Sequence, residues 1–179
     1  MEWWYTFELL FIDFKPGYQF GVGMDYYFND HWGIQPSLML ISKGYKIKGD
    51  YPPFINKSEQ LKSYDITDNK VYVELPLLLT YRFNVSGKYK LIFSGGGYVG
   101  YGIAGKTKNT ATLLNGSTRK EKMDSFSEGV EKFDTGLAAG ASLEYKEKYS
   151  IGLSSDFGLQ STQSTFKNRT YGLTFGYRF

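Results

Sequence analysis

The sequence predicts an all-β fold: a single domain, residues 1–179, forming an eight-stranded antiparallel up-and-down barrel. Three observations support this prediction. Apolar residues recur at every second position through most of the chain, glycine occurs 21 times, and aromatic residues make up 18% of the sequence. A period of two is typical of strands, and segments rich in aromatic residues and glycine favour strands and turns over helices.

Each predicted strand has a row of large apolar residues that alternates with a row of small or polar ones. In the closing segment, every second residue from Tyr171 to Phe179 is large and apolar. The same alternation predicts strands at about residues 3–14, 18–28, 32–46, 70–83, 88–105, 132–146, 148–160 and 169–179, the first with the weakest pattern. Pro36 and Pro76 each remove a ladder donor, so we expect local bulges or a shared water there.

The connections between these strands alternate in length. The turns NDH, NVSGK and KEK are tight, whereas residues 47–68 and 106–131 are predicted to be long loops. Short turns at one end and long loops at the other are the pattern of outer-membrane barrels, whose turns are periplasmic and whose loops are extracellular. The connection near Lys15 is short for an extracellular loop.

The glycines indicate which face of the barrel is inside. A soluble barrel of the lipocalin type also alternates, but its apolar face points inward. Here glycines share the polar face with charges, as Gly136 and Gly140 do with Glu144. The interior of an eight-stranded barrel is just wide enough for side chains to fill, so small residues suit it and the apolar face should look outward. We therefore predict a transmembrane barrel in a bacterial outer membrane, with a soluble lipocalin-like carrier as a less favoured alternative.

Aromatic residues at strand ends are expected near the membrane interface, where amphipathic rings settle. We assign six residues to this girdle: Trp32, Tyr81, Phe83, Tyr145, Tyr149 and Tyr177. No run approaches the roughly 20 consecutive apolar residues of a transmembrane helix. The opening residues, MEWWYTFELLFIDF, lack the features of a signal peptide, so we expect the mature form of an exported protein.

A family resemblance is carried by five segments: GIQPSLMLISKGYKI, VYVELPLLLTYRF, FSGGGYVGYGIAGK, FDTGLAAGASLEYKEKYSIGLSSDFGL and NRTYGLTFGYRF. These segments resemble the Bacteroidetes outer-membrane β-barrel family described as porin-like or PorT-like, over most of the chain from about Tyr18. ELPLLL and YGLTFGYRF are the most specific parts, and the first strand departs from the family pattern. The resemblance implies an eight-stranded barrel similar to small OmpA-type barrels, with Phe179 as part of the assembly signal. It implies no single activity.

Ionisable side chains on the polar faces are expected to meet in the narrow lumen. The predicted network contains Asp25, Glu74, Arg82, Lys90, Asp134, Glu144, Asp156 and Arg178, with Glu8 as a further candidate. Isolated buried charges cost on the order of several kcal/mol, so these groups must pair or hydrogen-bond. We favour a salt-bridged plug that fills the lumen. The alternatives are a narrow, charge-lined ion path and an acid–base pair of Glu74 and Glu144.

Two sequence motifs match nucleotide-binding patterns without the context that such sites need. GYGIAGKT (100–107) matches the phosphate-binding loop and GGGYVG (95–100) the dinucleotide-binding pattern, but nothing after Lys106 has a helical apolar period. His31, the single histidine, lies in a tight turn, where we interpret it as a solvated residue. With no cysteine in the chain as well, we predict no catalytic residue, cofactor or metal.

These observations predict a non-enzymatic integral outer-membrane protein whose role is structural or depends on its loops. The expected partners are outer-membrane lipid and a protein or polysaccharide at extracellular loops 47–68 and 106–131. The net charge of +3 is scattered along the chain, which argues against nucleic acid, and a monomer is the default. The alternative functions are a narrow porin for ions or small solutes and an accessory barrel of a secretion machine.

Overall fold

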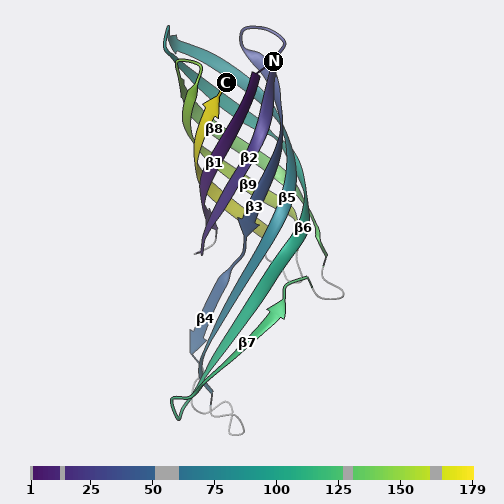
Figure 1. Cartoon of the computed structure of the whole chain (residues 1–179), viewed down its shortest axis with the longest axis vertical. Coiled ribbons are helices and arrows are strands. Elements are labelled where there is room, and N and C mark those ends of the chain that lie inside the picture. The colour runs from purple at the N-terminus through teal and green to yellow at the C-terminus, as the bar shows by residue number, and fades with distance from the viewer. Residues whose placement is uncertain (1, 13–14, 51–60, 127–130, 162–166) are drawn as a thin grey trace.

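The computed structural model describes residues 2–12, 15–50, 61–126, 131–161 and 167–179 (Figure 1). Within these residues the chain forms ten strands. They are β1 (Glu2–Ile12), β2 (Lys15–Tyr27), β3 (Trp32–Lys43), β4 (Lys46–Asp50), β5 (Leu61–Ser86), β6 (Tyr89–Leu113), β7 (Thr118–Asp124), β8 (Phe133–Tyr145), β9 (Tyr149–Ser161) and β10 (Lys167–Arg178). Every pairing between them is antiparallel.

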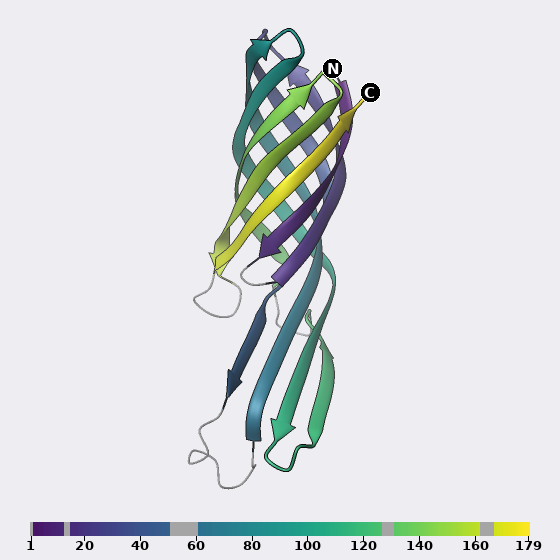
Figure 2. The ribbon, with the colours of Figure 1, turned by 90° about the vertical axis from the view of Figure 1, so that its left-hand side faces the viewer.

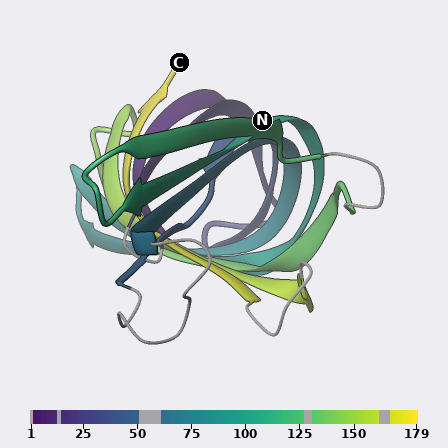
Figure 3. The same ribbon diagram turned by 90° about the horizontal axis from the view of Figure 1, so that it is seen from below.

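Eight of these strands close into a barrel. Their order is β5–β3–β2–β1–β10–β9–β8–β6, and β6 pairs with β5 to complete the ring, which Figure 3 shows from below. Closure pairs the backbone groups of the ring inside the protein, as a hydrocarbon environment requires. The predicted all-β, eight-stranded up-and-down barrel is confirmed. β4 and β7 are additional strands outside the ring, paired with β5 and β6.

β1 closes the ring between β2 and β10. Phe7 lies opposite Phe20 of β2 and opposite Phe175 of β10. The segment around Lys15, expected to be a connection, instead begins β2. Residues 13–14, the end of the predicted first strand, lie outside the described residues.

Tight turns gather at the end of the barrel that carries both chain termini (Figure 1). Residues 28–31 join β2 to β3, residues 87–88 join β5 to β6, and residues 146–148 join β8 to β9. Lys146 and Glu147 have φ values of 52° and 57°, as the central residues of tight hairpin turns often do. This end is periplasmic and the opposite end is extracellular.

A four-stranded sheet extends from the extracellular end of the barrel (Figure 2). β5 has 26 residues and β6 has 25, about twice the length of the other ring strands, and β4 and β7 pair with their protruding parts. We call β4, residues 61–70 of β5, residues 105–113 of β6, and β7 the blade. The expectation of loops at 47–68 and 106–131 is therefore wrong for the strand residues in these ranges. These strand residues lack the apolar alternation of a membrane strand, yet β5 and β6 continue to pair through them.

The outward face of the ring is apolar and the inward face is mostly polar, with Met39, Ile41 and Ile92 buried among the polar side chains. Leu75, Leu77 and Leu79 of β5 are exposed at every second position, whereas Glu74 and Thr80 are buried. Two neighbouring glycines show that the inward face is the crowded one. A Cβ at Gly96, which points inward, would collide with the carbonyl oxygen of Leu77, but one at the neighbouring Gly95 would meet nothing within 4 Å.

The prolines disturb the ladder without shifting it. Pairing of β3 with β2 and β5 is interrupted beside Pro36, but the register is the same on both sides of the gap. Pro76 lies opposite Tyr98 of β6 without a shift. Neither proline therefore causes a bulge, and a shared water at these positions stays a prediction. A register shift falls instead between Val71 and Tyr72, where β5 passes from the barrel into the blade.

Candidate functional site

Three charged residues meet in the extracellular half of the lumen. Lys43 of β3 forms an ion pair with Glu74 of β5, and its Nζ lies 2.9 Å from Oδ2 of Asp134 on β8. The three side chains are at most 5% exposed. Nζ of Lys43 also lies 5.6 Å from the ring centre of Tyr72 and 4.5 Å from that of Tyr98. We call these five residues the outer cluster; they link the ring across its interior.

Further polar contacts lie on the extracellular side of the outer cluster. Oδ1 of Asp68 accepts hydrogen bonds from Thr107 Oγ1 at 2.7 Å and from Ser125 Oγ at 2.6 Å. Phe126 packs edge-on against Tyr72, with 5.7 Å between ring centres. Ser125 and Phe126, which follow β7, are therefore held over the extracellular mouth of the lumen.

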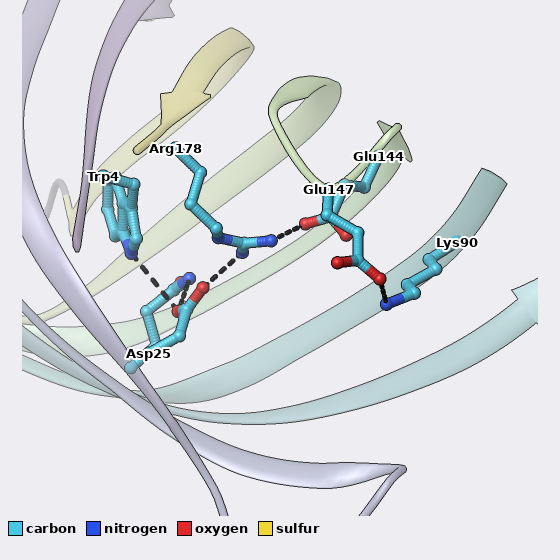
Figure 4. A network of polar contacts seen from close by, with 7 residues as sticks. Trp4, Asp25, Lys90, Glu144, Glu147 and Arg178 are labelled. Atoms are coloured by element: carbon cyan, nitrogen blue, oxygen red, sulfur yellow. Dashed lines mark hydrogen bonds and ion pairs between the residues drawn. The ribbon is translucent and has the colours of Figure 1, made fainter. Parts of the chain in front are cut away.

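A second cluster lies at the periplasmic end of the lumen (Figure 4). Arg178 of β10 forms ion pairs with Asp25 of β2 through Nη2 and with Glu144 of β8 through Nη1. Asp25 Oδ1 accepts hydrogen bonds from Trp4 Nε1 at 3.2 Å and from Gln35 Nε2 at 2.7 Å. We call these five residues the periplasmic cluster. The planar guanidinium suits this role, because it can donate in two directions at once.

The other predicted network residues occupy separate places. Lys90 forms an ion pair with Glu147 in the β8–β9 turn, where 63% of the glutamate side chain is exposed. The hydrogen bond and charge of Lys90 hold the pKa of Glu147 below its ordinary value. Arg82 lies over the ring of Tyr27, 3.5 Å from its centre. Asp156 lines an interior cavity.

This cavity has a volume of about 140 Å³ and adjoins the periplasmic cluster. Trp4, Gln35, Glu144 and Arg178 contribute to its wall, together with many serine, alanine and glycine residues. Because charged and hydroxyl-bearing side chains form part of its wall, a space of this size can hold several water molecules. The lumen is therefore filled mainly by polar and charged side chains, with Met39 and Ile41 among them and a small cavity beside the periplasmic cluster.

Glu74 and Glu144 do not form an acid–base pair. Glu74 lies in one ladder row with Gly100 and Asp134, and Glu144 lies ten residues further along β8. Ten residues of strand span about 33 Å, whereas the paired carboxylates of glycosidases are roughly 5–10 Å apart. The hypothesis of catalysis by this pair is therefore wrong.

Several residues that complete the two clusters were not predicted from the sequence. Lys43 shares its strand face with Gln35 and Ser37, so its position in the polar row was the available signal. Tyr72 likewise lies on the polar row of β5 beside Glu74, but the predicted network contained only charged groups. Glu8 lies opposite Gln19 and Thr174 in the register of β1, and its side chain lies outside the described residues.

The six predicted interface aromatics lie towards the periplasmic end of the barrel. Three pairs of rings lie close together there. The ring centres are 4.9 Å apart for Trp32 and Tyr81, 5.0 Å for Tyr89 and Tyr145, and 5.4 Å for Tyr149 and Tyr177. Phe83 is 52% exposed, and Phe179 lies 5.9 Å from the ring of Tyr5. These positions suit a girdle in the inner interface. That role, and the role of Phe179 in assembly, stay predictions.

The residues considered for catalysis or nucleotide binding lie in unsuitable surroundings. His31 is exposed in the β2–β3 turn, with its ring 5.7 Å from that of Tyr81. Among the described residues, no group of three or more His, Cys, Asp or Glu side chains is placed to hold a metal ion. Residues 100–107 lie wholly within β6, where a phosphate-binding loop would need a helix N-terminus. Lys106 lies opposite Asp124 of β7 instead.

A closed ring with an apolar outward face is the architecture of a barrel in lipid. Residues 7–164 match the family model described as "Outer membrane protein beta-barrel domain". The chain belongs to this family. The prediction of an outer-membrane β-barrel protein is therefore confirmed, and so is its location. No curated protein matches the chain. In the part of the chain that the structure describes, no helix is long and apolar enough to cross a membrane.

Solved structures of other outer-membrane proteins are similar to this barrel at low sequence identity. The attachment invasion locus protein Ail of Yersinia pestis is 18% identical, with a TM-score of 0.41 over 99% of this chain and 95% of Ail. Neisserial surface protein A is 10% identical, with a TM-score of 0.45 over 99% of this chain and 93% of its own. The KdgM porin is 12% identical, with a TM-score of 0.28 over 98% of this chain and 99% of its own. Because these TM-scores are low, the assignment rests on the family match.

Proposed function

We propose that this outer-membrane barrel is closed to solutes and presents its blade as an interaction surface outside the cell. One observation carries the proposal. A transmembrane strand needs about 9–11 residues, yet β5 and β6 have 26 and 25, and the additional length forms a sheet with two further strands. A barrel that served only to seal or to conduct would not need this extension.

The contents of the lumen support the closed state. Lys43 joins β3 to β5 and β8 in the extracellular half, and Arg178 joins β10 to β2 and β8 at the periplasmic end. Both clusters cross the interior of the ring and consist of buried or nearly buried ion pairs. An ion that passes through must separate these pairs, and breaking a buried pair costs on the order of 3–5 kcal/mol.

The blade offers two different faces to a partner. Cross-strand rows place Ile47, Ile66, Tyr64 and Met123 on the face that continues the lumen wall, together with Arg119. Ile47 and Met123 are 45% and 52% exposed. A mixed apolar and polar surface of this kind suits a protein or polysaccharide partner.

The same proposal has two further parts. The protein has no enzymatic role, and it belongs to the Bacteroidetes porin-like or PorT-like group.

A short-blade variant tests this function. Lys46 lies opposite Thr67, and Lys108 lies opposite Lys122. A two-residue turn between the members of each pair can therefore replace residues 47–66 and 109–121 with the register kept. We expect a partner that co-purifies with the full chain in mild detergent to be lost from the variant, although the variant still inserts and resists protease. A partner that stays bound to the inserted variant would contradict the proposal.

A narrow porin is the second candidate, and the cavity beside the periplasmic cluster favours it. Glu144 and Asp156 in its wall are suitable for a cation-selective path. This function predicts a conductance that persists in the short-blade variant and changes when Glu144 is replaced by Gln.

A further inference from the structure

Lysines gather on the outer face of the blade, the face that continues the lipid-facing surface of β5 and β6. Alternation along the strands and the cross-strand register place six exposed lysines there: Lys46, Lys48, Lys106, Lys108, Lys120 and Lys122. They come from β4, β6 and β7, and β5 lies between β4 and β6 in the blade. The sheet therefore assembles a basic surface from charges that look scattered in the sequence.

The carboxylates on this face do not balance the lysines. Asp50, Asp65 and Asp124 share it, which leaves a net charge of +3 from six lysines and three aspartates. Asp65 serves two lysines at once, at 3.5 Å from Lys46 and 3.6 Å from Lys48. Part of the positive charge is therefore available to a ligand.

One ladder row carries three of the lysines. Lys46, Thr67, Lys108 and Lys122 lie side by side across β4, β5, β6 and β7. Lys108 and Lys122 are direct cross-strand partners. Like charges in opposite positions of a sheet destabilise it, so an anion that lies over this row would relieve a repulsion built into the blade.

The position of this row relative to the apolar band indicates the source of the anion. Ile103, which is 54% exposed, is the last large apolar residue on the outward face of β6. Lys106 follows it by about 10 Å along the strand and Lys108 by about 17 Å. Outer-membrane strands tilt by roughly 35–45°, so the heights above the hydrocarbon are smaller, and lysine side chains can reach back towards the headgroups.

We propose that the outer face of the blade binds the phosphate-bearing headgroups of anionic lipids in the outer leaflet, with Lys106, Lys108 and Lys122 as the main contacts. Basic residues close to an anionic membrane surface are attracted to it. This inference goes beyond the proposed function, because it assigns one face of the blade to the membrane in which the barrel lies. The opposite face stays available to a partner.

Lysine footprinting in nanodiscs tests the proposal with the full chain. The barrel is inserted either into phosphatidylcholine alone or into phosphatidylcholine mixed with a diphosphorylated lipid A, and the acylation rate of each lysine is read by mass spectrometry. We expect Lys106, Lys108 and Lys122 to react about fivefold more slowly beside the anionic lipid, because one lysine near such a surface gains about that factor in affinity. Lys62, exposed near the tip of the blade, should change much less, and high salt should abolish the difference.

Two single variants make the test specific. Lys122→Glu replaces a like-charged pair by an opposite-charged pair with Lys108, so the blade keeps its fold while the charge of the basic row falls from +3 to +1. We expect the lipid-dependent protection of Lys108 to disappear. Arg119→Glu is the matched control, because it makes the same charge change on the same strand but on the other face. It should leave the protection unchanged.

Four results would overturn the proposal. Equal acylation rates in the two kinds of nanodisc would show that the face does not bind the lipid. A uniform slowing that includes Lys62, or an equal effect of both variants, would show a general influence of charge and no site. The same protection from a soluble sulfated oligosaccharide in phosphatidylcholine nanodiscs would show that the face binds free polyanions and is not specific to a membrane surface.

Discussion

Arg178 of β10 and Asp25 of β2 form an ion pair across the periplasmic end of the lumen, although 153 residues separate them in the sequence. β1 lies between their strands in the ring, so the pair bridges a strand rather than joining two neighbours. Glu144 extends the contact to β8 on the other side. The last strand is therefore joined to the ring by its side chains as well as by its backbone ladder.

Loss of this guanidinium should strongly destabilise the barrel. Arg178→Gln leaves Asp25 and Glu144, whose side chains are 1% and 2% exposed, without their cation. We expect a loss of about 3–5 kcal/mol in the free energy of unfolding, measured by urea titration of the barrel in lipid vesicles. The loss for Arg178→Lys should be smaller than that for Arg178→Gln, because the positive charge is kept. It should not be zero, because an ammonium lacks the planar fork that donates to both carboxylates. A double variant with Asp25→Asn that shows the full sum of the single losses would contradict this coupling.

Lys43 should matter equally in the outer cluster. Lys43→Met leaves Glu74 and Asp134 buried together without a cation, so we expect a destabilisation of about 3–5 kcal/mol in the same titration. Lys46→Met is the matched control. Lys46 is 40% exposed and lies 3.5 Å from Asp65, so its loss should cost less than about 1 kcal/mol. Similar losses for the two variants would show that burial does not set the strength of these pairs.

Two neighbouring glycines should respond oppositely to a methyl group. Gly96→Ala places a Cβ against the carbonyl oxygen of Leu77, which is backbone and cannot turn aside. We expect this overpacking to cost about 1–3 kcal/mol. Gly95→Ala meets nothing within 4 Å and should be neutral or slightly stabilising. Unfolding midpoints in urea distinguish the two, and a destabilised Gly95→Ala with an unaffected Gly96→Ala would reverse the assignment of faces.

The ion pair of Lys90 and Glu147 should give a small stabilisation that depends on pH. The pKa of Glu147 is lowered from its ordinary value of 4.5, so the stabilisation is present above that value and is lost as the pH falls through the lower pKa of the folded protein. Because 63% of the Glu147 side chain is exposed, the contribution should be below about 1 kcal/mol. Glu147→Gln should remove this acid dependence in unfolding measurements between neutral and acidic pH. An unchanged pH profile would show that the pair contributes nothing.

The barrel was predictable from the sequence because membrane and lumen impose opposite demands on alternate residues. Rows such as Leu75, Leu77 and Leu79 must face lipid, and Gly96 must face a crowded interior. The blade was not predictable in this way. Neither of its faces lies in hydrocarbon, so residues such as Thr67, Thr107 and Thr110 follow no apolar period, although they pair in a continuous ladder.

The candidate sites were predictable as sets of residues and not as contacts. Asp25, Glu144 and Arg178 were all expected in the lumen, but which charges meet depends on register around the closed ring. Lys90 was also expected in this network, but it forms an ion pair with Glu147 in the β8–β9 turn instead. The basic face of the blade depends on register in the same way, because Lys46 and Lys122 lie in one cross-strand row only when β5 and β6 are paired.

The central claim is that the two ion clusters close the lumen and leave recognition to the blade. Single-channel recording in planar bilayers, with insertion established separately by protease protection, tests it most directly. We predict that the inserted protein and its short-blade variant show no discrete current steps. Steps in the unmodified protein that change with Glu74→Gln or Arg82→Ala would show an open, charge-lined path and contradict the claim.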